Sequence, residues 1–389
     1  MGRSRLGISE RSQRISQSEI RTMSLECERV GGINLSQGIC DLELPSPVRA
    51  GAHRAIDAGL NHYTRYDGIP ELREAIARKA RAFNGIEADP GKNITVSCGA
   101  TGAFYCACLA LLNPGDEVIL FEPCYGYHVT TLLAANAVPR YVKLSPPGWG
   151  FDPAELERQV TPRTRGVMIN SPANPSGKVF SREEILLIAE ICDRHDLHIF
   201  TDEIYEYFVY DGRAHCSPAS IPEIRDRVVT ISGHSKTFSI TGWRIGYCIA
   251  REEFARAIGY VNDLVYVCGP APLQAGVAAG IFELPDEFYR GLCATYLRKR
   301  DSFCAVLSRA GLTPSVPQGA YYVLADISRL PGETSKQKAL YLMEKTGVAS
   351  VPGEAFYPAG GGGNLARFCF AKDDSVLETA GLRLLEFLT

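Results

Sequence analysis

The alternation of short apolar runs with helical segments is the feature that most constrains the fold. Between residues 94 and 250, strand-like runs such as NITVSCG, DEVILFEP and RGVMINSP are separated by segments with helical periodicity. A repeated strand–helix–strand order with thoroughly apolar strands predicts a mainly parallel sheet that is covered by helices on both faces. Beyond about residue 280 the strands become fewer and helices flank them, so we predict a second, smaller α+β domain in this chain of 389 residues.

Charge and cysteine usage exclude several classes of protein. A net charge of −3 argues against a general nucleic-acid binder, which needs a basic face. The 13 cysteines show no CxxC pair and no zinc-ligand spacing, so we expect small buried side chains in a reducing compartment and no metal site. No apolar run reaches membrane-spanning length, and the charged N-terminus has no apolar core behind it. We therefore expect a cytoplasmic protein without nucleic-acid or membrane partners.

Polar residues and glycines gather at the predicted carboxyl ends of four strands. They occur in SCGATG, INSPANPSG, FTDEIY and TISGHSK. Ligands of open α/β sheets bind at these strand ends, so Lys236 is expected at a ligand site. Partial burial among small residues would lower the pKa of this lysine and make its amine nucleophilic. The alternative is an ordinary solvated lysine.

Further residues near these strand ends complete a chemical inventory. Arg244 can donate two parallel hydrogen bonds to a phosphate. The turn CGATG, which includes the Thr101 hydroxyl, begins a helix whose N-terminus favours an anion. The turn lacks the P-loop and GxGxxG patterns, so a plain strand–helix turn stays open. Asp202 ends an apolar strand and needs a partner, while Asn174 is either a ligand or a turn asparagine. With Tyr205, these groups match the needs of pyridoxal phosphate.

The chain resembles the class I/II aminotransferases of the fold-type I pyridoxal-phosphate enzymes. The segments NSPANPSGKVF, TDEIYEYFVYDG and SKTFSITGWRIGY match the family in order and spacing, and LSQGICD, HYTRYDGIPELREAI, GDEVILFEPCYGY, PQGAYYVLADI and ARFCFA extend the match from about residue 33 to the C-terminus. The resemblance implies a mainly parallel seven-stranded sheet in a large cofactor-binding domain over 41–280. It also implies a small α+β domain over 281–389 and an N-terminal arm over 1–40 that packs with the small domain.

The resemblance also implies roles for single residues. Lys236 would form the aldimine with the cofactor and move the substrate proton, and Asp202 would pair with the pyridine nitrogen. Asn174 and Tyr205 would hydrogen-bond the ring hydroxyl oxygen, and Asn174 would also lie beside the substrate. The remaining residues would stack on the ring (Tyr125), hold the phosphate (Ala100, Thr101, Arg244), reach the phosphate of the neighbouring subunit of a homodimer (Tyr63), or meet the substrate carboxylate (Gly38, Arg367).

Two positions depart from the family pattern. The usual phosphate-binding serine is Gly233 here, and Ser235 and Ser232 are both candidates to replace it. Aspartate-specific relatives carry a lysine at the position of Ala100, so its absence favours neutral, aromatic or glutamine-like substrates over aspartate. The kynurenine/glutamine-type relatives share LSQG, HYT and SKTFSITGW with this chain.

The predicted activity is the transfer of an amino group from an L-amino acid to a 2-oxo acid. A β-lyase, a cyclase or an aminocyclopropane-carboxylate-type synthase would use nearly the same residues and stays open as an alternative. A regulator that carries this fold behind a DNA-binding domain is disfavoured, because the match begins near residue 33 and the chain is not basic. A nicotinamide dehydrogenase is disfavoured by the missing GxGxxG motif.

Overall fold

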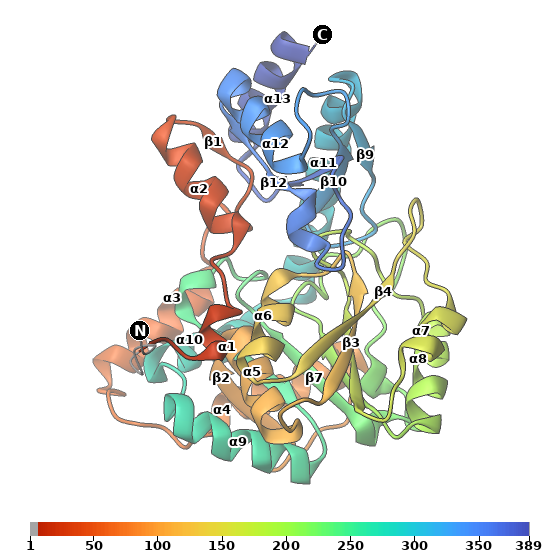
Figure 1. Ribbon diagram of the computed structural model, residues 1–389. Coiled ribbons are helices and arrows are strands. Elements are labelled where there is room, and N and C mark those ends of the chain that lie inside the picture. Colours follow the sequence, from red (N-terminus) through yellow and green to blue (C-terminus); the bar gives the residue numbers. More distant parts are fainter. Residues whose placement is uncertain (1–6, 389) are drawn as a thin grey trace.

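The computed structural model describes residues 7–388 and consists of a large unit and a smaller one, which lie at the bottom and top of Figure 1. The large unit is built on a seven-stranded sheet in the order β2-β8-β7-β6-β5-β3-β4. Neighbours from β7 to β4 are parallel, whereas β8 is antiparallel to both β7 and β2. The predicted α/β fold with a mainly parallel seven-stranded sheet is therefore confirmed. The strands are β2 (Ile94–Cys98), β3 (Glu117–Glu122), β4 (Val138–Lys143), β5 (Thr164–Asn170), β6 (His198–Asp202), β7 (Val228–Gly233) and β8 (Ile245–Ile249).

Alternate strand residues point to the two faces of this sheet, and each face is covered by helices. Leu120 and Phe200 pack against α5 (Gly99–Leu111), α6 (Gly126–Ala134) and α9 (Glu252–Tyr266). Their neighbours Ile119 and Ile199 pack on the opposite face, with residues of α7 (Pro153–Gln159) and α8 (Arg182–Arg194). Period-two alternation in strands that are apolar throughout accounts for this double burial. The β2–β8 edge is covered by α4 (Pro70–Lys79) and α10 (Ala271–Glu283), and α10 packs on α3 (Ser46–Asp57).

The smaller unit holds a four-stranded antiparallel sheet in the order β12-β13-β10-β9. Its central pair is β10 (Tyr322–Asp326) and β13 (Leu365–Cys369). The other strands and the helices are β9 (Thr313–Ser315), β11 (Val348–Ala349), β12 (Val351–Pro352), α11 (Asp286–Arg309), α12 (Ser335–Thr346) and α13 (Asp374–Leu388). Among the described residues no helix is both long and apolar enough to cross a membrane.

The N-terminal segment contacts both units. Helix α2 (Glu19–Arg29) buries Met23 and Cys27 against Ala339 and Met343 of the small unit, and β1 (Ile33–Asn34) pairs with β11. The short α1 (Glu10–Gln13) lies instead beside α6 of the large unit, in the lower part of Figure 1. The chain thus bridges the two units before it enters the large one.

A buried polar cluster lies behind the end of β6. The carboxylates of Glu203 and Glu206 are both buried; Glu206 contacts the Lys79 ammonium and accepts from Asn84 Nδ2 at 2.8 Å. His215 Nε2 lies 2.8 Å from Glu203 Oε2. Burial opposes the charge on Lys79, but the carboxylate of Glu206 outweighs it and raises the lysine pKa. The cluster therefore anchors the turn that follows β6 to helix α4.

Replacing Lys79 by Met should destabilise the protein strongly, because Glu206 would remain buried without its cation. We expect a loss of about 3–5 kcal/mol in the free energy of unfolding, measured by urea denaturation. The matched control is Arg81→Met, which breaks the Arg81–Glu87 ion pair, whose side chains are 67% and 64% exposed. That change should cost about 0–1 kcal/mol. Equal losses in the two variants would contradict this account of the cluster.

Candidate active site

A cavity of about 530 Å³ is lined by residues of the large unit, the small unit and the N-terminal segment. It collects residues that are far apart in the sequence. The predicted site residues in its wall are Gly38, Ala100, Thr101, Tyr125, Asn174, Asp202, Tyr205, Ser235, Lys236, Arg244 and Arg367. The exception is Tyr63, which does not line this cavity and is 83% exposed.

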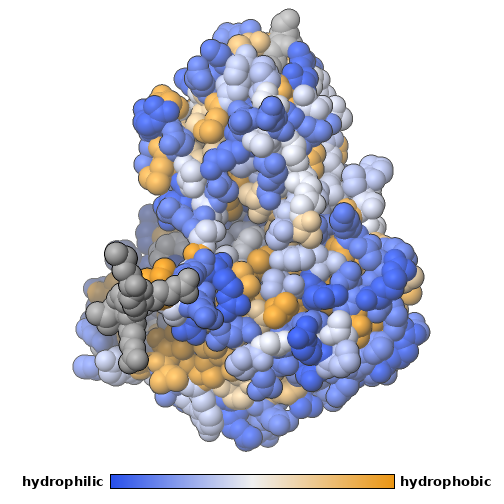
Figure 2. Space-filling view, viewed as in Figure 1, coloured by the Kyte–Doolittle hydropathy of each residue, from blue (hydrophilic) through white to orange (hydrophobic). Residues whose placement is uncertain are grey.

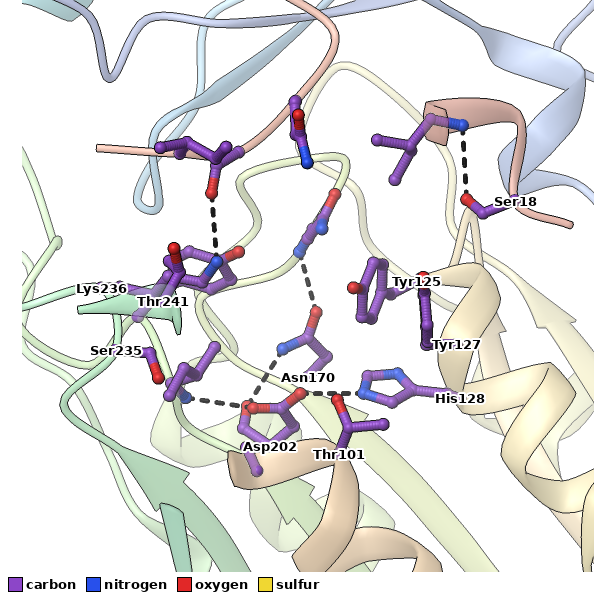
Figure 3. Close-up of a pocket in the computed structure, with 18 of the residues that line it drawn as sticks. Ser18, Thr101, Tyr125, Tyr127, His128, Asn170, Asp202, Ser235, Lys236 and Thr241 are labelled. Atoms are coloured by element: carbon purple, nitrogen blue, oxygen red, sulfur yellow. Dashed lines mark hydrogen bonds and ion pairs between the residues drawn. The ribbon is translucent and has the colours of Figure 1, made fainter. Parts of the chain in front are cut away.

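Lys236 lies in the connection between β7 and β8, three residues beyond the end of β7. Its Nζ donates to the carbonyl oxygen of Gly38 at 3.1 Å, as the upper dashed line at Lys236 shows in Figure 3. Among the described residues no carboxylate lies within ion-pair distance of this ammonium. Burial lowers the pKa of Lys236, and the charge of Arg244 acts in the same direction. The site therefore stabilises the charged ammonium less than water does, which shifts Lys236 towards its nucleophilic amine form.

Asp202 is the last residue of β6, and its carboxylate is fixed on both oxygens. Oδ2 lies 2.8 Å from Nε2 of His128, and Oδ1 accepts the backbone N–H of Ile204 at 3.1 Å. Asn170, at the end of the neighbouring β5, donates its Nδ2 to the Asp202 carbonyl oxygen at 3.0 Å. Figure 3 shows the imidazole, the amide and the carboxylate side by side in the cavity wall. This arrangement presents a carboxylate in one fixed orientation.

The first turn of α5 forms an anion cradle with Arg244. Gly99 has φ +76°, and a Cβ there would lie 2.3 Å from Nη2 of Arg244. A Cβ on Gly246 would lie 2.3 Å from the backbone nitrogen of Ala100. Only glycines allow β8 and the guanidinium so close to the helix start, where backbone N–H groups lack intrahelical partners. A helix N-terminus beside a guanidinium is suited to a phosphate.

The two serines that were left open at the sequence level lie in different places. Ser235 is in the cavity wall. The Ser232 hydroxyl instead donates towards Glu206 Oε1 at 3.2 Å, within the buried cluster behind β6. The geometry thus makes Ser235, and not Ser232, available to a ligand in the cavity.

Arg367 of β13 is a fully buried cation at the cavity wall. Nη1 donates to Asn174 Oδ1 at 2.8 Å, and Nη2 donates to the carbonyl oxygen of Ser36. Nε has no partner among the described residues. A guanidinium has five N–H donors, so three remain for a ligand. A buried cation with spare donors and no carboxylate nearby is suited to bind one.

Aromatic side chains close the remaining sides of the cavity. The hydroxyl groups of Tyr205 and Tyr322 lie 3.0 Å apart, and burial raises the pKa of Tyr205, which keeps its phenol protonated. The Tyr322 ring lies 4.2 Å from Cζ of Arg367. A Cβ at Gly38 would lie 1.8 Å from the Tyr322 hydroxyl, so only glycine fits there. Tyr125 meets His128 edge to face, with ring centroids 5.4 Å apart.

Sequence reasoning missed several lining residues. His128, Asn170 and Tyr322 contact predicted site residues. Asn170 and Tyr322 stand in segments that were already singled out, INSPANPSG and PQGAYYVLADI, and the terminal position of Asn170 on a strand was a usable signal. Nothing local marks His128, because its contact with Asp202 spans 74 positions of the chain.

Comparisons with known proteins agree with this geometry. Residues 30–383 match the family model for aminotransferase class I and II. The chain is 34% identical to kynurenine–oxoglutarate transaminase 3 of Rattus norvegicus over 90% of this chain and 83% of that protein. The structure of N-succinyldiaminopimelate aminotransferase from Mycobacterium tuberculosis superposes with a TM-score of 0.94 at 35% identity, covering 98% of this chain and 100% of that one. Thermus thermophilus aspartate aminotransferase with maleate gives a TM-score of 0.91 at 32% identity, covering 98% and 100%. The chain belongs to the class I and II aminotransferases, the pyridoxal-phosphate-dependent enzymes of fold type I.

Proposed function

We propose that the enzyme moves an amino group from an L-amino acid with a neutral, aromatic or glutamine-like side chain to a 2-oxo acid, with Lys236 as the reacting amine. The observation that carries the proposal is the Lys236 amine, which has no carboxylate partner in the described part of the chain and shares one cavity with Asp202 and Arg367. An uncharged amine, a fixed carboxylate and a buried guanidinium are the three groups that amino transfer needs at once.

The cavity residues fit pyridoxal phosphate, which supplies an aldehyde and an electron-withdrawing ring. The cradle formed by Gly99, Thr101 and Arg244 would hold the phosphate, with Ser235 as a further hydroxyl donor. Asp202 would meet the ring nitrogen, since its carboxylate is held in place by His128. The ring face would lie against Tyr125, and Asn174 and Tyr205 would donate to the ring hydroxyl oxygen.

The chain's own residues would then handle the substrate and its proton. Arg367 and Asn174 orient the substrate by its α-carboxylate, beside Gly38. Lys236, once its amine is free, would take the proton from the substrate Cα and hold it on Nζ for its return. Because burial raises the pKa of Tyr205, its phenol stays protonated and remains a hydrogen-bond donor in the cavity wall. Water would then release the donor as a 2-oxo acid, and a second 2-oxo acid would take up the amino group.

The preference for neutral side chains is supported by Ala100 and by apolar groups in the cavity wall. Ala100 offers no cation, and Ile20, Ile39 and Tyr127 provide apolar surface. A solved relative that is 30% identical is described as having a methionine aminotransferase function, with a TM-score of 0.93. Another relative, 37% identical, is an aspartate/prephenate aminotransferase of Cereibacter sphaeroides, so the family contains both kinds of substrate.

The activity test mixes the purified holoenzyme with single amino acids and an oxo acid. We expect kcat/KM for glutamine, methionine or an aromatic donor to exceed that for aspartate by about tenfold or more, because Ala100 offers no cation where aspartate-specific relatives carry a lysine. Lys236→Ala should lower kcat by about 10²–10⁴-fold. The matched control Lys92→Ala, at an exposed ion pair with Glu252, should retain activity.

Release of ammonia in place of amino transfer would indicate a lyase and contradict the proposal. Unchanged turnover in Lys236→Ala would also contradict it. Aspartate as the best donor would overturn the neutral-substrate part alone.

We further propose a homodimer with shared active sites. Tyr63 is 83% exposed and does not line the cavity of its own chain, and large side chains of α9 are also exposed, with Leu264 at 86% and Tyr260 at 59%. Figure 2 shows apolar residues gathered on the lower left of the large unit. Such a patch is typical of an interface, and a second copy would bring Tyr63 to the phosphate of the neighbouring cavity.

A mixing experiment tests this sharing. Tyr63→Ala should lower kcat/KM about 10–100-fold, because one hydrogen bond to a charged phosphate is lost. Mixing Tyr63→Ala with Lys236→Ala chains should restore activity, since each mixed dimer regains one complete site. A monomer by light scattering, or no recovery after subunit exchange, would contradict the proposal.

A further inference from the structure

The cavity wall carries one more cation than the proposed function uses. Its basic side chains are Arg21, Lys236, Arg244 and Arg367, and Asp202 is its only carboxylate among the described residues. The proposed function gives Lys236 the reacting amine, Arg244 the phosphate and Arg367 the α-carboxylate. Arg21 is therefore the cation for which no anion has been assigned.

The guanidinium of Arg21 is available to a ligand. Among the described residues no carboxylate lies within ion-pair distance of this guanidinium, and its N–H groups have no hydrogen-bond partner. The backbone nitrogen of Arg21 donates to the carbonyl oxygen of Ser18 at 2.9 Å. The other charged residue in this turn is engaged elsewhere, because Glu19 pairs with Lys336 at 3.1 Å. Ser18 caps this helix from the side of the cavity opposite Lys236, as Figure 3 shows.

Helix α2 ties the position of Arg21 to that of Arg367. Arg21 and Ser24 are three residues apart and lie on one face of α2, about 4.5 Å apart along the axis. The Ser24 hydroxyl lies 3.3 Å from the Ser36 hydroxyl, and the Ser36 carbonyl accepts from Nη2 of Arg367. Met23 and Cys27 pack this helix against the small unit. The backbone that carries Arg21 is thus linked, through Ser24 and Ser36, to the guanidinium of Arg367.

We propose that Arg21 is a specificity residue that binds a second, distal carboxylate of the substrate, so that the amino acceptor is a dicarboxylic 2-oxo acid. This inference rests on the proposed function. With its α-carboxylate on Arg367, a dicarboxylic acid would hold its other carboxylate within the same cavity, whose wall includes Arg21. A neutral donor leaves Arg21 in solvent and uses the apolar wall of Ile20 and Ile39 instead. One cavity can thereby serve a neutral donor and an anionic acceptor in turn.

The test compares two acceptors in the holoenzyme, with one neutral amino acid as the donor. 2-Oxoglutarate probes the distal carboxylate, and pyruvate lacks it. Arg21→Gln should lower kcat/KM for 2-oxoglutarate about 10–100-fold, mainly through KM, because one charge-assisted hydrogen-bonded pair is lost. The value for pyruvate should change less than about threefold. Arg21→Lys should retain part of the 2-oxoglutarate activity, because lysine keeps the positive charge but cannot donate two parallel hydrogen bonds to a carboxylate.

A control and a salt series separate specificity from folding. Arg29 lies at the other end of the same helix, in an exposed ion pair with Glu26, so Arg29→Gln should leave kcat/KM for both acceptors unchanged. Added salt should raise the KM for 2-oxoglutarate more in the wild type than in Arg21→Gln. The inference would be overturned if Arg21→Gln lowered kcat/KM equally for both acceptors, or if it left kcat/KM for 2-oxoglutarate unchanged. A wild type that transfers to pyruvate but not to 2-oxoglutarate refutes only this inference, whereas no transfer between any pair refutes the proposed function as well.

Discussion

The desolvation of a single amine, that of Lys236, is the interaction on which the rest of the site depends. The side chain enters a cavity where its nearest polar partner is the carbonyl oxygen of Gly38 and where Arg244 adds a second positive charge. A charged ammonium is poorly stabilised there, so the amine is kept ready to attack a carbonyl. The uncharged stretch of sequence around Lys236 has the same origin, since a neighbouring carboxylate would restore the charge.

A second lysine, Lys79, shows that a carboxylate partner can reverse the effect of burial on the pKa of a lysine. Lys79 is more fully buried than Lys236, but it contacts Glu206, and its pKa is raised where that of Lys236 is lowered. The carboxylates of Glu203 and Glu206 and the imidazole of His215 lie within 4.8 Å of one another, as metal ligands would. The Lys79 ammonium already supplies a positive charge at this place. The cluster therefore supports the turn that carries Asp202 and Tyr205 from behind.

Much of the fold could be predicted because its signals are local. Strand–helix alternation predicted the mainly parallel sheet. Residue types that favour helix starts also stand where helices begin: Ser181 with Glu184 caps α8, and Asp152 caps α7. The antiparallel β8 was not predicted, although the short connection around Lys236, which has no crossover helix to bring the chain back in parallel, was a usable signal for it.

The site was predictable where chemistry and strand ends coincide and was missed where contacts are distant. Asp202 and Lys236 follow strands, so the topology brings them together. His128 and Arg21 lie on helices, and they reach the cavity only through the packing of α6 and α2, which no short motif records. The choice between Ser232 and Ser235 likewise depends on which face of the β7 end each hydroxyl meets.

The titration of Lys236 tests the central claim most directly. The rate at which the cofactor-free protein captures an aldehyde should be followed against pH, with Lys236→Ala to identify the phase that belongs to this amine. A protonated amine does not react, so the rate rises with pH through the pKa of Lys236 in the folded protein and then levels off. The account predicts a midpoint below the ordinary lysine value of 10.5. A midpoint at or above that value would show that the cavity stabilises the ammonium, and it would contradict the account.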